Sequence, residues 1–174
     1  GRHLLHGSTD FVFDGKDSRP YTEDDAPNPL EWYGQTKLEA EQRVKESGCD
    51  HTIVRIAYPY RAEYPQKPDI VRNLIQGLQN KTLYPQFADT LISPTFVDDI
   101  VNAFIAVIKH RPQGTLHAVG SSSISNFELA RNVASTFGFD PETVQRGSLT
   151  EYLVKPGVRP YARYSNLSND ALVK

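Results

Sequence analysis

The chain has 174 residues, of which 39% are hydrophobic and 23% charged, with a formal net charge of −2 at pH 7. This composition is typical of a globular protein and gives no electrostatic reason to expect a nucleic acid or an anionic membrane as partner. No apolar run approaches the roughly 20 residues that a membrane span needs. A single cysteine, Cys49, excludes an internal disulfide and fits a reducing, cytoplasmic compartment, and the histidines show no metal-ligand spacing, so no metal site is expected.

The first third of the sequence predicts a strand, a long helix and a second strand. Residues 3–7 read as a short buried strand, with 11–13 as its aromatic continuation, and a polar loop follows. A helix is predicted from about residue 30 to 47, with Gly48 as its stop. The β-branched run 51–57 suits a buried parallel strand. Together these elements indicate a βαβ unit and an α/β fold with a partial Rossmann-like parallel sheet.

The predicted helix 30–47 has a packed face and a solvated face. Leu38 and Val44 mark the stripe that we expect to face the sheet. The solvated face is expected to carry the charged residues Glu39, Glu41, Lys45 and Glu46.

The remainder of the chain predicts shorter elements. Three more helices are expected, over residues 69–79, 100–109 and 126–137. Ser125 with Glu128 three residues later forms a capping box for the last of them. Short strands or extended segments are expected at 83–87, 91–93 and 115–119. The tail from residue 155 is rich in Pro, Gly, Arg, Tyr and Asn and is expected to be loosely ordered.

A tyrosine and a lysine four residues apart begin the long helix. Tyr33 and Lys37 therefore lie on one face, and the hydroxyls of Ser8 and Thr9 end the preceding strand. An ammonium beside a phenol favours the ionised phenol, which suits a tyrosine that donates a proton. Chance gives about 0.4 such pairs in this composition, so the pair alone is a weak signal, and a surface helix pair is the alternative. Its place strengthens the catalytic interpretation, because ligands of open α/β sheets gather at the carboxyl ends of strands.

Longer runs around these residues resemble the dTDP-4-dehydrorhamnose reductase family of the extended short-chain dehydrogenase/reductase superfamily. The runs are Ser-Thr-Asp-Phe-Val-Phe-Asp-Gly at 8–15, Pro-Leu-Glu-Trp-Tyr-Gly-Gln-Thr-Lys-Leu-Glu-Ala-Glu at 29–41, Val-Arg-Ile-Ala-Tyr at 54–58 and Ser-Pro-Thr-Phe-Val-Asp-Asp-Ile at 93–100. The resemblance covers nearly the whole chain. It implies a cytoplasmic NAD(P)-dependent oxidoreductase that reduces the 4-keto group of a nucleotide-linked deoxysugar.

The resemblance also implies roles for individual residues. Thr9, helped by Ser8, polarises the keto oxygen, and Tyr33 donates the proton. Lys37 holds the nicotinamide ribose, and the cofactor-binding set is Ser8, Tyr33, Lys37 and Tyr58. The substrate side comprises Asp10, Phe11, Tyr58 and Thr95. From the residues alone, Asp10 could instead cap its loop, and Tyr58 could be rim packing.

One element of the family is missing from this sequence. Family members begin with a strand, a glycine-rich turn and a helix that receives the cofactor pyrophosphate, and no Gly-x-x-Gly-x-x-Gly run occurs here. We therefore expect a C-terminal portion, in which residues 1–60 form the catalytic half of a Rossmann-like domain. Residues 61–174 are expected to form mainly a small α+β substrate-binding subdomain, with 94–110 returning to the first part.

The missing strands have consequences for binding and assembly. NADPH or NADH is the expected cofactor, bound poorly by this portion alone, so that its activity would be weak or absent. An uncovered edge of the parallel sheet would favour a homodimer or other self-association. The alternative function is a non-catalytic regulatory or binding subunit of the same fold, like the methionine adenosyltransferase β subunit.

Overall fold

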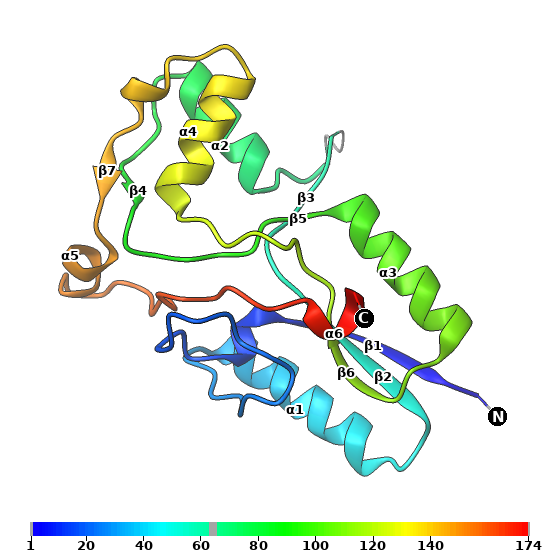
Figure 1. Ribbon diagram of the computed structural model, residues 1–174. Helices are drawn as coiled ribbons and strands as arrows, with labels where there is room; N and C mark the ends of the chain where they lie inside the picture. Colours follow the sequence, from blue (N-terminus) through cyan, green and yellow to red (C-terminus); the bar gives the residue numbers. More distant parts are fainter. Residues whose placement is uncertain (1, 63–65, 174) are drawn as a thin grey trace.

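The computed structural model describes residues 2–62 and 66–173, and it has the α/β architecture that the sequence predicts (Figure 1). Helix α1 (Trp32–Glu46) links two neighbouring parallel strands, which confirms the predicted βαβ unit. The parallel sheet has the strand order β1–β2–β6, from β1 (Leu4–Thr9), β2 (His51–Ile56) and β6 (Gly114–His117). None of the described helices is long and apolar enough to cross a bilayer.

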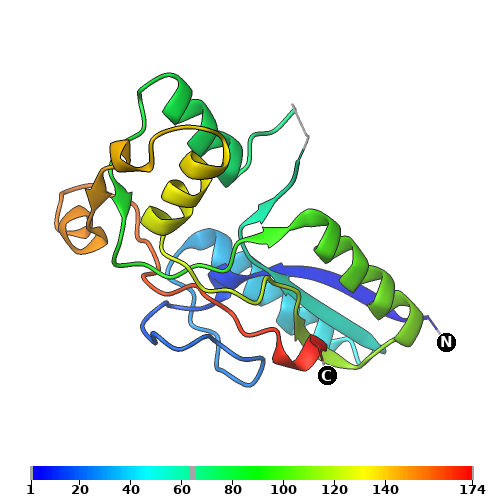
Figure 2. The ribbon, with the colours of Figure 1, turned by 45° about the horizontal axis from the view of Figure 1, so that its top comes forward.

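Helices α1 and α3 (Val97–His110) cover opposite faces of this sheet (Figures 1 and 2). Side chains alternate along a strand, so neighbouring residues of β2 face different helices. Val54 packs in a buried cluster with Val107 of α3. Its neighbour Arg55 forms an ion pair with Glu41 of α1. Strand β1 lies at one edge of the described sheet, and self-association through this edge stays a prediction.

A second group of elements lies above the sheet in the view of Figure 1. Helices α2 (Ile70–Gln79) and α4 (Asn126–Thr136) pack side by side around a buried cluster that includes Leu74 and Val133. Two short parallel pairs accompany them, β3 (Pro59–Tyr60) with β5 (Thr95–Phe96), and β4 (Gln86–Phe87) with β7 (Arg146–Gly147). The remaining short elements are η1 (Asp10–Val12), η2 (Pro141–Thr143), α5 (Leu149–Leu153) and α6 (Asp170–Val173). Strand β6 belongs to the main sheet although it lies outside the 94–110 stretch that the sequence assigns to the Rossmann-like part.

Two predictions about loops and tails are wrong. The stretch 11–13 does not continue the first strand, because the Thr9 hydroxyl accepts a hydrogen bond from the backbone N–H of Phe11 and starts a turn of 3-10 helix. The tail is not loosely ordered throughout, because residues 165–167 are buried. Leu167 joins a buried core cluster that includes Phe13 and Tyr21 from the opposite end of the chain.

The prediction for the charged face of α1 is wrong at one residue, and the prediction for the start of α4 is correct. Glu41 of α1 does not lie on a solvated face: it is 0% exposed and bonded to Arg55. The pattern of α1 alone could not show this, because the partner that makes burial of a carboxylate tolerable lies on the next strand. The capping box predicted for α4 is confirmed, since Ser125 and Glu128 make both of its hydrogen bonds.

Candidate functional site

A cleft of about 470 Å³ opens at the carboxyl end of β1. Its walls come from the end of β1, from η1, from the first turns of α1 and from the residues that follow β2. The topology brings these segments together because parallel strands end at one edge of the sheet, where α1 begins. The predicted site residues that line it are Ser8, Thr9, Asp10, Phe11, Tyr33, Lys37 and Tyr58.

The start of α1 is held closely against the end of β1. Lys37 Nζ donates to the carbonyl oxygen of Gly7 at 2.8 Å. The Tyr33 ring meets the Phe11 ring edge-on, with 5.5 Å between centroids and an interplanar angle of 80°. Gly34 permits this approach, because a Cβ there would lie 2.2 Å from the Phe11 carbonyl oxygen. Tyr33 is 49% exposed, so its ring remains accessible to a ligand in the cleft.

Thr9 and Asp10 form a buried hydrogen-bonded pair at the floor of the cleft. The Thr9 hydroxyl donates to Asp10 Oδ1 at 3.0 Å. Asp10 is 2% exposed, and its other carboxyl oxygen, Oδ2, has no hydrogen-bond partner among the described residues. Burial raises the pKa of Asp10 to about 7, against the opposing hydrogen bond from Thr9. Near neutral pH this carboxyl group is therefore able to donate a hydrogen bond to a ligand or to accept one.

Two predicted site residues have hydroxyls that are engaged elsewhere. The Ser8 hydroxyl donates to Glu41 Oε1 at 2.5 Å, so its hydrogen is used in a bond to α1, and its role toward a cofactor stays a prediction. Thr95 does not line the cleft at all. Its buried hydroxyl donates to the Ser93 carbonyl at 3.1 Å and accepts from the Gly120 N–H at 3.2 Å, which fixes two loops together. The structure thus does not bring Thr95 into the cleft with the other predicted site residues.

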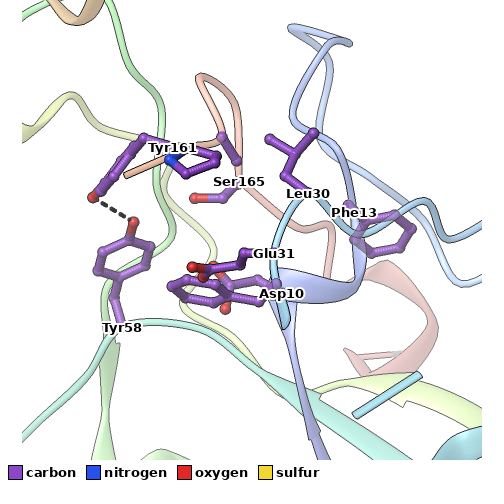
Figure 3. A pocket seen from close by; sticks show the side chains of 10 residues that line it. Asp10, Phe13, Leu30, Glu31, Tyr58, Tyr161 and Ser165 are labelled. Atoms are coloured by element: carbon purple, nitrogen blue, oxygen red, sulfur yellow. Dashed lines mark hydrogen bonds between the residues drawn. The ribbon is translucent and has the colours of Figure 1, made fainter. Parts of the chain in front are cut away.

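Tyr58 lines both the cleft and a smaller cavity of about 20 Å³, whose lining side chains are drawn in Figure 3. Its backbone has a φ of 42°, which is uncommon for a residue with a side chain and is found more often at functional sites. Its hydroxyl is hydrogen-bonded to the hydroxyl of Tyr161 at 3.0 Å. Burial raises the pKa of Tyr58 well above its ordinary value, so this hydroxyl stays protonated and can donate.

The smaller cavity is built largely from residues to which the sequence assigned no role. It shares Asp10, Phe11 and Tyr58 with the cleft. The C-terminal segment supplies one wall, and the remaining lining residues are Phe13, Leu30, Glu31, Pro160, Tyr161, Ala162 and Ser165. The signal that could have found them is weak: the late Arg159-Pro160 and the 165–169 run resemble the C-terminal region of the family.

An ion pair joins the C-terminal segment to Glu31, which directly precedes α1 and lines this cavity. Arg159 Nε donates to Glu31 Oε2 at 2.6 Å, and its guanidinium lies 5.9 Å from the centroid of the Phe11 ring. The hydrogen bond and charge of Glu31 raise the pKa of Arg159 above its ordinary value. The segment therefore reaches the cavity through contacts with the beginning of α1 and with η1.

A buried charge network lies beneath the cleft. Arg55 Nε and Nη2 donate to the two carboxylate oxygens of Glu41 at 2.9 and 2.7 Å. Burial disfavours the ionised form of Glu41, but its bonds to Arg55 and Ser8 hold its pKa below the ordinary value. Burial lowers the pKa of His117, whose Nδ1–H donates to the Ser168 carbonyl at 3.2 Å. Its Nε2 is then free to accept from Arg55 Nη1 at 3.4 Å.

Comparison with known proteins identifies the family. A family model described as the RmlD substrate binding domain matches residues 1–174. The chain belongs to this family. A dTDP-4-keto-6-deoxy-D-glucose reductase of Streptomyces niveus is 31% identical over 169 residues, which are 97% of this chain and 57% of the relative. A dTDP-4-dehydrorhamnose reductase of Mycolicibacterium smegmatis is 35% identical over 144 residues, 82% of this chain and 43% of the relative.

The chain is also similar to solved structures of dTDP-4-dehydrorhamnose reductases. A dTDP-4-dehydrorhamnose reductase from Bacillus anthracis, crystallised in complex with NADP, matches with a TM-score of 0.84 and 29% identity. The match covers 98% of this chain and 58% of that chain. An orthologue from Clostridium acetobutylicum matches with a TM-score of 0.81 and 31% identity, over 96% and 57% of the two chains. The chain thus spans about half the length of its relatives, and the resemblance inferred from its motifs is confirmed.

Within residues 2–62 and 66–173, no group of three or more His, Cys, Asp or Glu side chains is arranged to hold a metal ion.

Proposed function

We propose that this chain forms the catalytic wall and the sugar-binding part of an NAD(P)-dependent reductase, which reduces the 4-keto group of a nucleotide-linked deoxysugar. The observation that carries the proposal is the convergence of Thr9, Tyr33 and Lys37 on one cleft at the end of β1. The names of the relatives, which are dTDP-sugar reductases, support the same reaction class.

Thr9 and Tyr33 would act on the keto oxygen. The Thr9 hydrogen now bonded to Asp10 would turn to the ketone and stabilise negative charge on its oxygen. Tyr33 would donate its proton to this oxygen as the alkoxide forms. A positioned side chain of this kind accelerates proton transfer by about 10²–10⁴-fold. Lys37 would favour the tyrosinate that remains, because an ammonium stabilises a neighbouring anion.

The cleft also suits the nicotinamide end of the cofactor. When bound, a reduced nicotinamide would supply hydride to the carbonyl carbon. Lys37 donates one N–H to the Gly7 carbonyl and keeps two further N–H donors for ribose hydroxyls. The sequence contains no glycine-rich turn for the pyrophosphate, so the residues of this chain fit one end of the cofactor alone. The Bacillus anthracis relative was crystallised with NADP, which supports this cofactor class.

The sugar would lie where the cleft meets the smaller cavity. Asp10, Phe11 and Tyr58 line both spaces, and they offer a carboxyl group, an aromatic face and a hydroxyl. Among the described residues, Oδ2 of Asp10 and the Ser165 hydroxyl are buried polar atoms that make no hydrogen bond of standard geometry, although Ser165 lies close enough to favour the ionised form of Asp10. Sugar hydroxyls would satisfy both, since buried polar atoms are normally hydrogen-bonded.

The test is oxidation of NADPH or NADH with a dTDP-4-keto-6-deoxy sugar by the full-length gene product that contains this sequence. Tyr33→Phe is expected to lower kcat by about 10²–10⁴-fold, because it removes the proton donor. The matched control is Tyr152→Phe, which removes a hydroxyl outside the cleft and keeps the ring beside Phe87. An unchanged kcat in Tyr33→Phe would show that another group donates the proton.

A different result would favour the alternative function. If the full-length gene product binds the nucleotide sugar but oxidises no NADPH or NADH, the chain is better described as part of a non-catalytic regulatory or binding subunit. Calorimetric titration with the nucleotide sugar, run beside the rate assay, separates these two outcomes.

A further inference from the structure

Four polar side chains are buried together between the sheet and α1. Ser8, Arg55 and His117 stand opposite one another on β1, β2 and β6, and so form one row across the sheet. Glu41 of α1 lies over this row and bonds to two of its members. All four side chains are buried, and we refer to them as the Glu41 cluster.

The hydrogen bonds of the Glu41 cluster leave helix α1 little freedom to move relative to the strands. Glu41 accepts two parallel hydrogen bonds from the planar guanidinium of Arg55, at 2.9 and 2.7 Å, and a third from Ser8 at 2.5 Å. Such a fork fixes the distance and the orientation of both planar groups. Apolar side chains would fill the same space but would allow the helix to slide along the strands.

Stability gives a poor explanation for this cluster. Burying two opposite charges removes both from water, and apolar residues of similar volume often make a protein equally stable or more so. The best-attested use of a buried polar contact is to specify one register among several that packing alone permits. We therefore ask which parts of the protein the Glu41 cluster holds in register.

The cluster joins the two elements that carry the candidate catalytic groups. Glu41 follows Lys37 by one turn of α1 and Tyr33 by about two, which places it roughly 6 and 12 Å further along the helix axis. Ser8 directly precedes Thr9 on β1. A shift of Glu41 relative to this row would move the helix residues relative to Thr9.

We propose that Glu41 and Arg55 are positioning residues, which hold α1 in register against the carboxyl end of β1. Neither residue lines the cleft, so they act through Tyr33 and Lys37 and not on the ligand. The inference rests on the proposed reductase function, because it concerns how that function's proton donor is placed.

The experiment replaces the pair by apolar residues of similar size, Glu41→Leu with Arg55→Met, in the full-length gene product. The melting temperature is expected to stay within about 5 °C of the parent. Because misplacement of a reacting group by about 1 Å can cost about 10²-fold in rate, kcat should fall by about 10–100-fold. KM for the nucleotide sugar should change less than about 3-fold, since groups that touch the sugar are retained.

A matched control removes an ion pair that is remote from α1. Arg131 of α4 and Glu142 of η2 form an exposed pair, and Arg131→Met with Glu142→Gln should leave kcat unchanged. A Glu41/Arg55 variant that is as stable as the parent and has the parent's kcat would overturn the proposal. If this variant does not fold, Glu41→Gln decides, because it keeps the shape of the side chain. A lower kcat with an unchanged KM then supports the proposal, and an unchanged kcat refutes it.

If the unsubstituted full-length gene product has no reductase activity, that result counts against the proposed function and not against the positioning role of Glu41 and Arg55. Amide hydrogen exchange over residues 33–40 then provides the decisive measurement. Faster exchange of these amides in the stable apolar variant supports the positioning role, and equal exchange overturns it.

Discussion

Gly34→Ala tests directly whether the close approach of α1 places the candidate proton donor. A Cβ at this position would lie 2.2 Å from the Phe11 carbonyl oxygen and 2.9 Å from Pro29 Cβ. Ordinary contact begins near 3.4 Å, so the first turn of α1 must move away from η1 by about 1.2 Å. A backbone carbonyl cannot swing aside as the end of a long side chain can, so the helix itself has to shift.

Two opposing terms decide the effect of Gly34→Ala on stability. Alanine favours a helix over glycine by about 1 kcal/mol, while forcing extra volume into a packed site costs about 1–3 kcal/mol. We expect a net loss of up to about 2 kcal/mol in the free energy of unfolding. The same displacement, applied to the adjacent Tyr33, should lower kcat by about 10²-fold.

Urea denaturation and the NADPH oxidation assay measure these two effects separately. The matched control is Gly77→Ala in helix α2, where the nearest atom to the new Cβ is Leu83 Cδ1 at 3.0 Å, the end of a flexible side chain. This control should be neutral or slightly stabilising. If Gly34→Ala is as stable as Gly77→Ala and keeps the parent's kcat, the close approach does not place Tyr33 and the reasoning is refuted.

Three further substitutions test single contacts. Burial raises the pKa of Asp10 from 3.8 to about 7, so its contribution to stability is present below about pH 4 and is lost as the pH rises to about 7. Between pH 4 and 8, the free energy of unfolding of Asp10→Asn, measured from melting curves, should therefore rise relative to that of the unsubstituted protein by up to about 4 kcal/mol. A difference that does not change with pH would show that burial does not raise the pKa of Asp10. Ser125→Ala removes the capping box with Glu128 and should lower the free energy of unfolding in urea by about 1 kcal/mol; no change would show that the cap is dispensable. Arg159→Ala breaks an exposed ion pair with Glu31, so stability should change by less than about 1 kcal/mol while amide exchange in the C-terminal segment accelerates, and unaltered exchange would show that the ion pair does not hold this segment.

Features that depend on neighbouring residues were predicted well from the sequence. The β-branched run at 51–57 became the central strand of the sheet, because burial on both faces selects such residues. The capping box at Ser125 formed as predicted, since its donors and acceptors lie within one helical turn. The spacing of Tyr33 and Lys37 placed both side chains at one cleft for the same local reason.

Features that depend on distant partners could not be predicted in this way. The hydroxyl pair of Tyr58 and Tyr161 joins residues 103 positions apart, and the sequence gives no periodic signal for such a contact. Thr95 shows the same dependence, because its hydroxyl, which the resemblance assigned to the substrate side, joins two loops, and its role toward a substrate stays a prediction. Polar residues therefore carry little information about burial until their partners are known.

Helix α1 is held at two points by contacts of different physical kinds. Gly34 fixes its first turn by close packing, and Glu41 fixes it about 10 Å further along by charge and hydrogen bonds. A helix held at two points along its axis can neither slide nor tilt, whereas loss of one point leaves the other as a pivot. Tyr33 lies beside the first point, so losing that point should displace it more than losing the second. Because both contacts hold one rigid element, their effects on kcat should combine less than additively, while their effects on stability, which arise from separate contacts, should add.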